Sequence, residues 1–434
     1  MPRESVRAYR FRAALSGAVG ALIFVIPSAH EPSSARPSGL SNGRATEVMP
    51  PASTHAAPST GLFAAACTGR GHCVAGGDYQ AGSKPVEPVV AAQSRGHWSR
   101  GIRLLLPANA SPQPYSQVNG IACVSAGNCV AVGDYEYGKS NSLQAFVATE
   151  THGKWARAFA PRLPGNSSAQ ASAQLGAVAC THSGFCEAVG TYQDSSGNAQ
   201  AMALAKPAGG RWRPATEITA PASAAGNPDA DLTGIACRGS GTCVAVGNYS
   251  VSVTRFAAMG AVESRGAWHR AVGIAAPHNA VSSTFTAISS ITCPATGSCI
   301  GVGEYAVSGT QSRAMSVTES KGRLSAATEI TAVPHDASTR PSTYLLGVSC
   351  SSANSCVAVG GGRNKAGHSV AMYMTRWHGH WRAAFLPPPP RAATGDHALS
   401  ALYSVSCTHR DDCTAVGYYN DQTGTRRAEA ASTR

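Results

Sequence analysis

Seven copies of one cysteine pair constrain the fold of this chain more than any other feature. Each pair has the spacing Cys-x5-Cys, and successive pairs begin 56, 57, 57, 56, 57 and 57 residues apart in a chain of 434 residues. A fixed period of this length is typical of a repeat architecture and argues against two or three unlike domains. The pairs are Cys67 with Cys73, Cys123 with Cys129, Cys180 with Cys186, Cys237 with Cys243, Cys293 with Cys299, Cys350 with Cys356, and Cys407 with Cys413.

A second marker recurs with the cysteines. A tryptophan follows the second cysteine of a copy by 25 or 26 residues, and Leu324 takes this place in the fifth copy. Gly-x precedes each of them, as in "RGHW" and "HGKW", which predicts a hairpin turn where glycine has a positive φ. We expect these residues to pack between repeats, with stacking on a carbohydrate as the alternative. They are Trp98, Trp155, Trp212, Trp268, Leu324 and Trp381.

Each copy contains four short segments with the composition of β-strands, such as "GIAC", "CVAVGDY", "AFVATE" and a segment that begins at the tryptophan. They are apolar with little alternation, as expected when neighbours cover both faces of a sheet. The low charged fraction of 13%, with 46 Gly and 26 Pro, also favours turn-rich β structure. A four-stranded unit of this length fits one blade of a β-propeller. The sequence therefore predicts an all-β, seven-bladed β-propeller with four antiparallel strands per blade.

The two ends of the chain complement each other. Only 21 residues follow Cys413, so the seventh copy lacks its fourth strand. The segment "ATEV" at 45–48 matches "ATEI" at 215–218 and 327–330, which are fourth-strand segments. We expect the N-terminal segment, near residues 43–49, to complete the last blade and remove an exposed edge. A chance match in an Ala/Thr-rich linker is the alternative.

The first 35 residues have the pattern of a secretory signal. Four arginines precede an apolar stretch from Ala13 to Ile26, which at 14 residues is short for a transmembrane span. An uncleaved anchor is the alternative. Residues 36–60 are predicted to be a Pro/Ser/Ala-rich linker that contains the closing strand, and 61–434 the propeller. We therefore expect a secreted or cell-envelope-associated protein with no membrane span in its mature form.

The chemistry expected of the fourteen cysteines follows from export. Pairs that flank a five-residue turn in an exported protein are expected to form disulfides, here seven within blades. A metal would need four ligands, whereas blades hold neighbouring pairs apart. Seven equivalent catalytic thiols serve no mechanism. We expect no cofactor and no metal.

The phrase "C-x5-C-x-A-V-G" with a later Gly-x-Trp resembles secreted bacterial seven-bladed propellers related to the sialidase-type (BNR) and photosystem-assembly-factor-like groups. The resemblance covers about residues 42–434 and implies the propeller fold. The aspartate box of sialidases, Ser-x-Asp-x-Gly-x-x-Trp, is not legible at the tryptophan turns. A sialidase would also need an arginine triad and a Tyr/Glu pair from different blades.

Two sets of recurring polar residues are candidates for solvated strand ends. Glutamates of the third strand recur at equivalent places, and a variable residue follows the second-strand glycine. Recurrence indicates structure, because a glycosidase needs one unique carboxylate pair. The glutamates are Glu150, Glu263 and Glu319, and the variable residues are Asp78, Asp134, Thr191, Asn248, Glu304, Gly361 and Tyr418.

Three features occur only once. "WHGHW" at 377–381 could bind a metal or a sugar, but an exposed turn is the commoner case. "PPPP" at 387–390 is a stiff spacer or a docking segment. "RDD" at 410–412 lies in a tight turn and could bind cations weakly.

The net charge of +12 is spread along the chain, and no run of four basic residues follows residue 35. Nucleic acid is therefore not an expected partner, whereas anionic envelope polymers are permitted. The sequence predicts a monomeric, exported, non-enzymatic binding scaffold for an envelope or extracellular glycan or a protein partner. Loops at one face or at the mouth of the central channel would bind it. A sialidase-like glycoside hydrolase or lyase acting at the channel mouth is the alternative.

Overall fold

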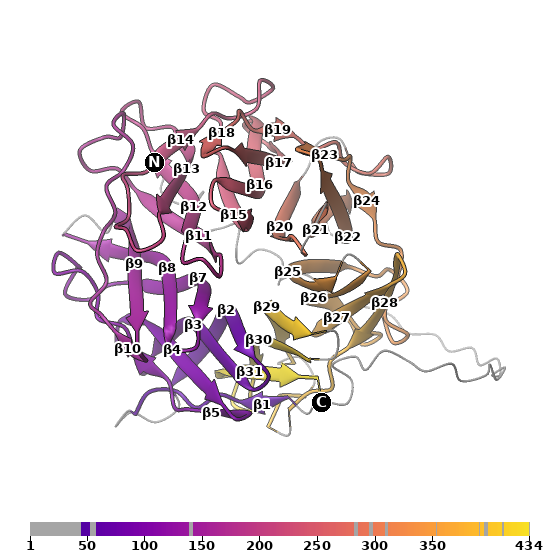
Figure 1. Ribbon diagram of the computed structural model, residues 1–434. Coiled ribbons are helices and arrows are strands. Elements are labelled where there is room, and N and C mark those ends of the chain that lie inside the picture. The colour runs from indigo at the N-terminus through magenta and orange to yellow at the C-terminus, as the bar shows by residue number, and fades with distance from the viewer. Residues whose placement is uncertain are drawn as a thin grey trace, which may run out of the picture.

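The computed structural model describes residues 45–52, 58–138, 142–281, 285–294, 298–308, 311–352, 354–389, 391–394, 398–409 and 412–433. In these residues the regular secondary structure consists of β-strands, which form seven antiparallel sheets. Figure 1 shows the sheets arranged as blades around one axis. The chain is a seven-bladed β-propeller, as the repeats predict. The predicted signal segment, 1–35, lies outside the described residues.

The strands of a blade are labelled A to D from the axis outward. Blade 1 contains β2 (Ser59–Gly69), β3 (His72–Gln80), β4 (Val86–Ser94) and β5 (His97–Trp98), with β6 (Ile102–Arg103) also on β4. Blade 2 contains β7 (Ser116–Ser125), β8 (Asn128–Tyr137), β9 (Ser142–Thr151) and β10 (Lys154–Trp155). Blade 3 contains β11 (Ala173–Cys180), β12 (Cys186–Gln193), β13 (Ala199–Lys206) and β14 (Thr216–Ile218).

The remaining blades repeat this order. Blade 4 contains β15 (Asp231–Gly239), β16 (Thr242–Ser252), β17 (Arg255–Ser264) and β18 (Ala267–Trp268), with β19 (Val272–Gly273) on β17. Blade 5 contains β20 (Thr286–Thr292), β21 (Ser298–Ser308), β22 (Gln311–Ser320) and β23 (Arg323–Leu324), with β24 (Thr328–Glu329) on β22. Blade 6 contains β25 (Thr343–Ser352), β26 (Ser355–Arg363), β27 (Ser369–Trp377) and β28 (His380–Phe385). Blade 7 contains β29 (Ser400–His409), β30 (Asp412–Asn420), β31 (Arg426–Ser432) and β1 (Thr46–Glu47).

The two ends of the described chain meet in blade 7. Strand β1 pairs antiparallel with β31, with Thr46 opposite Ala430. The next residue, Val48, donates from its backbone N–H to the carbonyl of Ala428 at 3.0 Å, and its side chain is 2% exposed. The prediction that an N-terminal strand completes the last blade is confirmed, with pairing by residues 46–48. Residues 43 and 44 lie outside the described residues.

The seven disulfides are present with the predicted pairing, and each one joins the end of an A strand to the start of the B strand in the same blade. The second cysteine of every pair is the more deeply buried, with an exposed fraction of 3% or less. The first cysteine is half-buried. The bonds join Cys67 to Cys73, Cys123 to Cys129, Cys180 to Cys186, Cys237 to Cys243, Cys293 to Cys299, Cys350 to Cys356, and Cys407 to Cys413.

The C–D turns lie beside these disulfide-closed hairpins, since the N–H of Gly96 donates to the carbonyl of Gly71 at 3.1 Å. Arg95 and Gly96 have φ values of 50° and 83°, so the predicted glycine turn is confirmed in a form with two positive φ angles. We call this side of the propeller the disulfide face. The opposite side, with the B–C hairpins and the loops between blades, is the loop face.

Hydrophobic clusters hold neighbouring blades together. Val74 of blade 1 and Cys129 of blade 2 belong to one cluster, and Val246 of blade 4 and Ile288 of blade 5 to another. The six residues predicted to pack between repeats are half-buried, and each contacts the cluster that its blade shares with the preceding one. They are Trp98, Trp155, Trp212, Trp268, Leu324 and Trp381.

Every A strand contains a β-bulge, which inserts one residue four positions before the first cysteine. Because the A strands are the innermost strands in Figure 1, the bulge residues form a ring around the axis. Adjacent A strands pack closely, since a Cβ on Gly120 would lie 2.9 Å from the Cα of Ala177. The ring is varied in chemistry and consists of Phe63, Asn119, Gly176, Thr233, Ser289, Leu346 and Tyr403.

No helix among the described residues has the length and apolar character needed to cross a membrane.

Candidate functional site

Aromatic and charged side chains gather where blades 6, 7 and 1 approach the axis. We call this group the axial cluster. Two members are bulge residues, and the others lie in the halves of their strands that point to the loop face, away from the disulfides. The cluster consists of Phe63 in β2, Asp78 in β3, Tyr344 in β25, Tyr403 in β29, Tyr418 in β30 and Arg426 in β31.

An ion pair fixes the charged part of the axial cluster. The Nη2 of Arg426 lies 2.6 Å from Oδ1 and 2.7 Å from Oδ2 of Asp78, and the N–H of Gly61 donates to Oδ1 at 3.1 Å. The side chain of Asp78 is 5% exposed and that of Arg426 is 20% exposed. The pair joins blade 7 to blade 1. It holds a partly exposed guanidinium in one position near the axis.

Three aromatic rings surround this guanidinium. The ring centroids of Phe63 and Tyr403 are 5.1 Å apart, edge to face, and those of Tyr403 and Tyr418 are 5.7 Å apart. The Cζ of Arg426 lies 5.8 Å from the Phe63 centroid and 5.5 Å from that of Tyr418, within the range of a cation–π interaction. All three rings are half-buried, so each keeps part of its surface in contact with solvent.

The electrostatics of the axial cluster favour hydrogen-bond donors. Burial raises the pKa of Tyr403 and of Tyr344, and the nearby Tyr418 raises both further. Burial also raises the pKa of Asp78, against the lowering effect of Arg426. Burial alone would lower the pKa of Arg426, but the Asp78 carboxylate raises it overall. At neutral pH the phenols of Tyr403 and Tyr344 are therefore protonated, and the Arg426 guanidinium is charged.

A missing side chain makes room for Tyr344. Gly361 occupies in blade 6 the position that Asp78 holds in blade 1 and Tyr418 in blade 7. A Cβ on Gly361 would lie only 2.3 Å from the Tyr344 hydroxyl oxygen. The glycine thus allows the Tyr344 ring to lie across β26.

The variable residues after the second-strand glycine are less solvated than expected. Asp134 is 1% exposed and accepts a hydrogen bond from Asn119 Nδ2 at 2.7 Å. Burial raises the pKa of Glu304, although Ser312 lowers it by a hydrogen bond. Thr191 and Asn248 are half-buried.

The prediction that the third-strand glutamates are solvated is wrong. Glu150, Glu263 and Glu319 are 6%, 3% and 0% exposed. Each lies beside the second cysteine of its blade, where the C–D turn covers it. Glu319 accepts a hydrogen bond from Gly322 N in that turn at 2.6 Å and pairs with Arg238 of the preceding blade.

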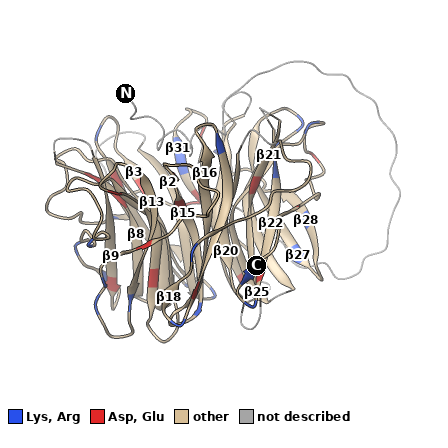
Figure 2. Cartoon of the chain, turned by 90° about the horizontal axis from the view of Figure 1, so that it is seen from above, with Lys and Arg blue, Asp and Glu red and all other residues tan. Residues whose placement is uncertain are grey.

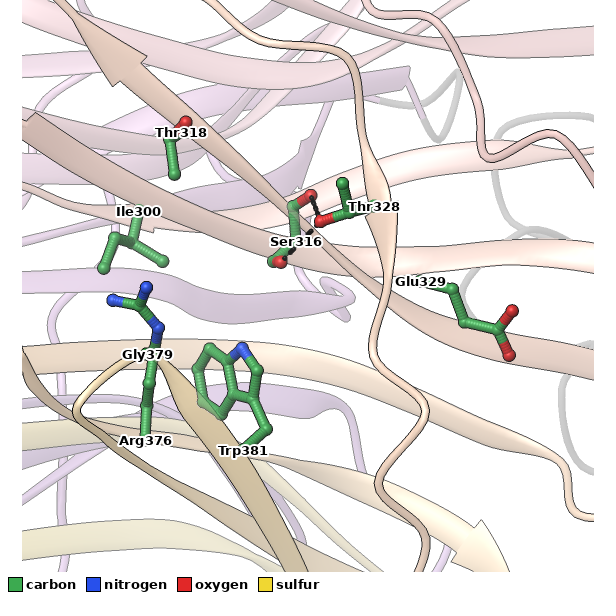
Figure 3. Close-up of a pocket in the computed structure, with 8 residues that line it drawn as sticks. All are labelled: Ile300, Ser316, Thr318, Thr328, Glu329, Arg376, Gly379 and Trp381. Atoms are coloured by element: carbon green, nitrogen blue, oxygen red, sulfur yellow. Dashed lines mark hydrogen bonds between the residues drawn. The ribbon is translucent and has the colours of Figure 1, made fainter.

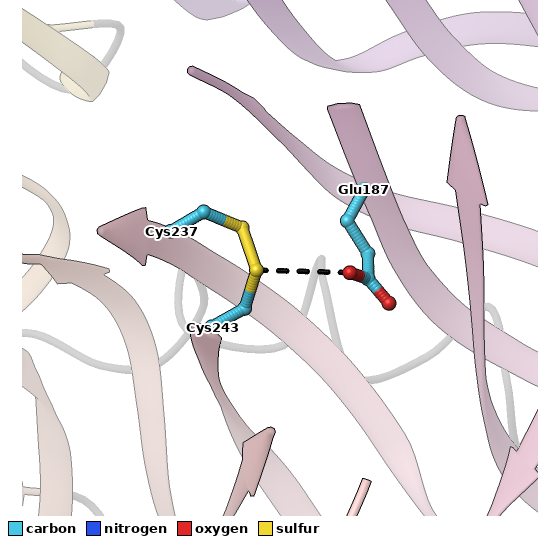
Figure 4. Close-up of side chains that lie close together, drawn as sticks. All are labelled: Glu187, Cys237 and Cys243. Atoms are coloured by element: carbon cyan, nitrogen blue, oxygen red, sulfur yellow. Dashed lines mark hydrogen bonds between the residues drawn. A yellow bond between two sulfur atoms is a disulfide. The ribbon is translucent and has the colours of Figure 1, made fainter. Parts of the chain in front are cut away.

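Two of the buried carboxyl groups meet between blades 3 and 4. The Oε1 of Glu187 accepts a hydrogen bond from Trp268 Nε1 at 2.7 Å, and its Oε2 lies 3.6 Å from Cys243 Sγ (Figure 4). Burial and the neighbouring Glu263 raise the pKa of Glu187 to about 8. Both sulfurs beside it belong to the Cys237–Cys243 disulfide. They offer no thiolate ligand, so this group is not a metal site.

A surface pocket lies between blades 5 and 6 (Figure 3). It has a volume of about 250 Å³ and is lined by Ile300, Ser316, Thr318, Thr328, Glu329, Arg376, Gly379 and Trp381. The Arg376 guanidinium and the Trp381 indole are neighbours on one wall, whereas Glu329 is at the other end. Glu329 is already engaged, because Asn279 donates to it at 2.8 Å. Of "WHGHW", only Gly379 and Trp381 line this pocket.

The other two single features lie partly outside the described residues. Residues 387–389 of the proline run have no regular structure, and 390 is outside. Of "RDD", only Asp412 is described, and it accepts a hydrogen bond from the Thr408 hydroxyl.

Most of the axial cluster was missed by sequence reasoning. Asp78 and Tyr418 were singled out as variable, but Phe63, Tyr403 and Arg426 were not. Phe63 and Tyr403 could have been found from the sequence. They lie four residues before the first cysteine of their copies, at a position that varies among the repeats although the rest of the strand is similar. Arg426 has no such signal, because its role depends on closure of the ring.

Comparison with known proteins finds only distant structural similarity. No family model and no curated protein matches the chain. It is similar to a Hadza microbial sialidase, with a TM-score of 0.46, 10% identity, and coverage of 87% of this chain and 66% of the sialidase. A protein of unknown function from Dyadobacter fermentans has a TM-score of 0.49 and 12% identity, over 90% of this chain and 98% of that one. An α-L-arabinanase from Penicillium chrysogenum has a TM-score of 0.40 and 10% identity, over 86% and 93%.

Proposed function

We propose that this protein is an exported, non-enzymatic binding scaffold that holds an extracellular glycan at the axial cluster. The observation that carries the proposal is the set of three half-buried rings around a guanidinium that Asp78 holds in place. Sugar rings present apolar C–H faces and a rim of hydroxyls. Aromatic rings with fixed polar groups among them complement both kinds of surface.

Export is supported by the cysteines. Seven disulfides with no free cysteine in the described residues fit an oxidising compartment outside the cytoplasm. Residues 1–35 would direct the chain there. We propose that the exported protein acts as a monomer, because one chain closes the ring.

A sialidase-like hydrolase or lyase is the second candidate, and one observation favours it. Tyr344 of blade 6 is close enough to Glu304 of blade 5 for the glutamate to raise the tyrosine pKa. A Tyr/Glu pair from different blades is what that chemistry uses. Against it, a nucleophilic tyrosine needs a lowered pKa, whereas burial raises that of Tyr344. The binding function is therefore the better supported.

The first experiment measures binding and cleavage together. The purified protein is mixed with a panel of bacterial and host polysaccharides, and thermal shift, calorimetric affinity and new reducing ends are followed. We expect a glycan that stabilises the protein without yielding products, because a ligand of the folded state alone raises its stability. New reducing ends would make hydrolysis the primary function.

Two phenylalanine variants locate the site. Phe63→Ala removes a ring of the axial cluster, and Phe159→Ala removes one that is 40% exposed on the outer edge of blade 2. We expect Phe63→Ala to weaken glycan binding roughly tenfold, since a stacked ring contributes about 1 kcal/mol or more. Phe159→Ala should bind as the parent protein does. Equal affinities for both variants would place the glycan elsewhere.

A further inference from the structure

The C–D turns of blades 1 to 6 share an unusual charge. Eleven of the 35 Lys and Arg lie in the six segments 94–100, 151–157, 207–213, 264–270, 320–324 and 377–382, and these segments contain no Asp or Glu. Each blade contributes at least one exposed cation. We call one such residue from each blade the basic arc: Arg95, Lys154, Arg211, Arg265, Lys321 and Arg382.

The cations of the basic arc are far apart in the sequence but lie on the same face of the folded protein. Members of the basic arc are about one repeat apart along the chain, so no basic run is visible. Because every C–D turn lies on the disulfide face, the blades place them side by side along one rim. Figure 2 shows Lys and Arg at the turns along the edge where β18 lies.

These cations have no carboxylate partner among the described residues. None of the ion pairs between described side chains includes a member of the basic arc. Other arginines of the same turns are engaged, since Arg100 donates to the carbonyl of Pro50 and Arg157 to that of Leu106. Among the described residues, no carboxylate therefore neutralises the charge of the basic arc.

The arc is open at blade 7. There the fourth strand is β1 from the other end of the chain, so no C–D turn connects it to β31. In the sequence, the A–B hairpin of that blade carries Arg410 together with Asp411 and Asp412. A row of positive charges with two ends fits a linear polymer.

We propose that the basic arc binds a linear anionic polysaccharide, independently of the axial cluster on the other face. The tryptophans of the C–D turns pack against the seams between blades, so the arc offers charge rather than open rings for stacking. Single-stranded nucleic acids are usually held through stacked bases as well as charge. The seven disulfides also fit an oxidising compartment outside the cytoplasm, away from the nucleic acids of the cytoplasm.

The test compares two variants of equal charge. The arc variant carries Arg95→Gln, Arg211→Gln, Arg265→Gln and Lys321→Gln. The control variant carries Lys84→Gln, Arg162→Gln, Arg255→Gln and Arg340→Gln, which are exposed residues of the B–C hairpins and of the segments between blades. Both lose three Arg and one Lys at solvent-exposed positions, so both should fold, which thermal unfolding checks.

Dextran sulfate is the probe, with neutral dextran of the same length and single-stranded DNA as comparison ligands. We expect the parent protein to bind dextran sulfate in a salt-dependent way and not to bind neutral dextran. Only the arc variant should bind dextran sulfate roughly tenfold or more weakly, and its affinity should depend less on salt. Equal weakening in both variants would show that only net charge matters and would overturn the site. Binding of neutral dextran, tighter binding of the DNA, or no binding of dextran sulfate would overturn the partner.

Discussion

One residue in the second strand of blade 3 departs from its repeat. The position after the second cysteine holds an apolar or small side chain in six blades, whereas blade 3 has Glu187. This carboxyl group is 2% exposed beneath Trp268 and beside Glu263. Two carboxylates cannot both be charged in such a place, so the folded protein retains a proton there. The six other residues are Val74, Val130, Val244, Ile300, Val357 and Thr414.

Glu187→Gln should reduce the loss of stability with rising pH. The pKa of Glu187 is raised from 4.5 to about 8 in the folded protein, so the folded state holds more protons than the unfolded state between these values. The stabilisation is complete below about pH 4.5 and declines as the pH rises to 8. Glutamine has no proton to lose, and its carbonyl can still accept from Trp268.

The measurement is urea unfolding of parent and variant at pH 5 and pH 8. We expect the variant to gain stability relative to the parent at pH 8 by roughly 2 kcal/mol. Glu429, whose pKa burial also raises to about 8, retains part of the slope in both proteins. The matched control is Glu87→Gln in blade 1, which leaves Glu187 in place and should therefore retain the pH dependence that Glu187 causes. Parallel pH profiles for parent and Glu187→Gln would contradict the prediction.

Gly361→Val tests a second single-residue feature. The new side chain would displace Tyr344, because a Cβ there lies 2.3 Å from its hydroxyl oxygen. We expect glycan affinity at the axial cluster to fall roughly three- to tenfold, or about 1 kcal/mol. Thr191→Val changes the same repeat position in blade 3 and should leave the affinity as it is. Calorimetric titration with the glycan identified for the parent protein measures both.

At the scale of elements, the strands and turns within one blade can be predicted from the sequence. The contacts between neighbouring blades are harder to predict. The cysteine spacing and the Gly-x-Trp turn indicate an A–B hairpin and a C–D turn, because both signals are local in the chain. The burial of Glu319 is not only local, since Arg238 of the preceding blade pairs with it. Closure was predictable for a particular reason. The segment 45–48 repeats the composition of the outer strands, so Val48 could be assigned by its distance from Cys67.

Val48→Asp should destabilise the protein by opening blade 7. Val48 is 2% exposed and packs with Leu62 of blade 1 and Val416 of blade 7, so a carboxylate there would be buried without a partner. We expect the free energy of unfolding to fall by roughly 3 kcal/mol or more. The neighbouring Met49 is 47% exposed, and Met49→Asp should have little effect. Thermal melts of the two variants decide, and similar melting temperatures would mean that β1 does not close the ring.

At the scale of the whole molecule, the residues that build the fold repeat along the sequence, whereas the residues of the axial cluster depart from the repeat. The repeated positions build a symmetrical ring, and they are what the sequence reveals. The axial cluster depends on departures from the repeat: Phe63 and Tyr403 at two bulges, Gly361 in blade 6, and an Asp78–Arg426 pair whose members are 348 residues apart. Sequence periodicity cannot show which departures meet, because that depends on which blades become neighbours when the ring closes. The basic arc was hidden for the converse reason, since one cation per repeat looks like scattered charge.

The pairing of β1 with β31 also sets how the exported chain can complete its ring. Thr46 donates its hydroxyl hydrogen to the carbonyl of Ala430, a partner 384 positions later in the chain. The strands of blades 1 to 6 lie between these two partners in the sequence, so blade 7 is complete only when two distant segments meet. Until then the folding chain is an open row of blades, and the outer edge of β31 has no partner. Because contacts between distant residues form slowly, we expect this open row to be the state most exposed to aggregation.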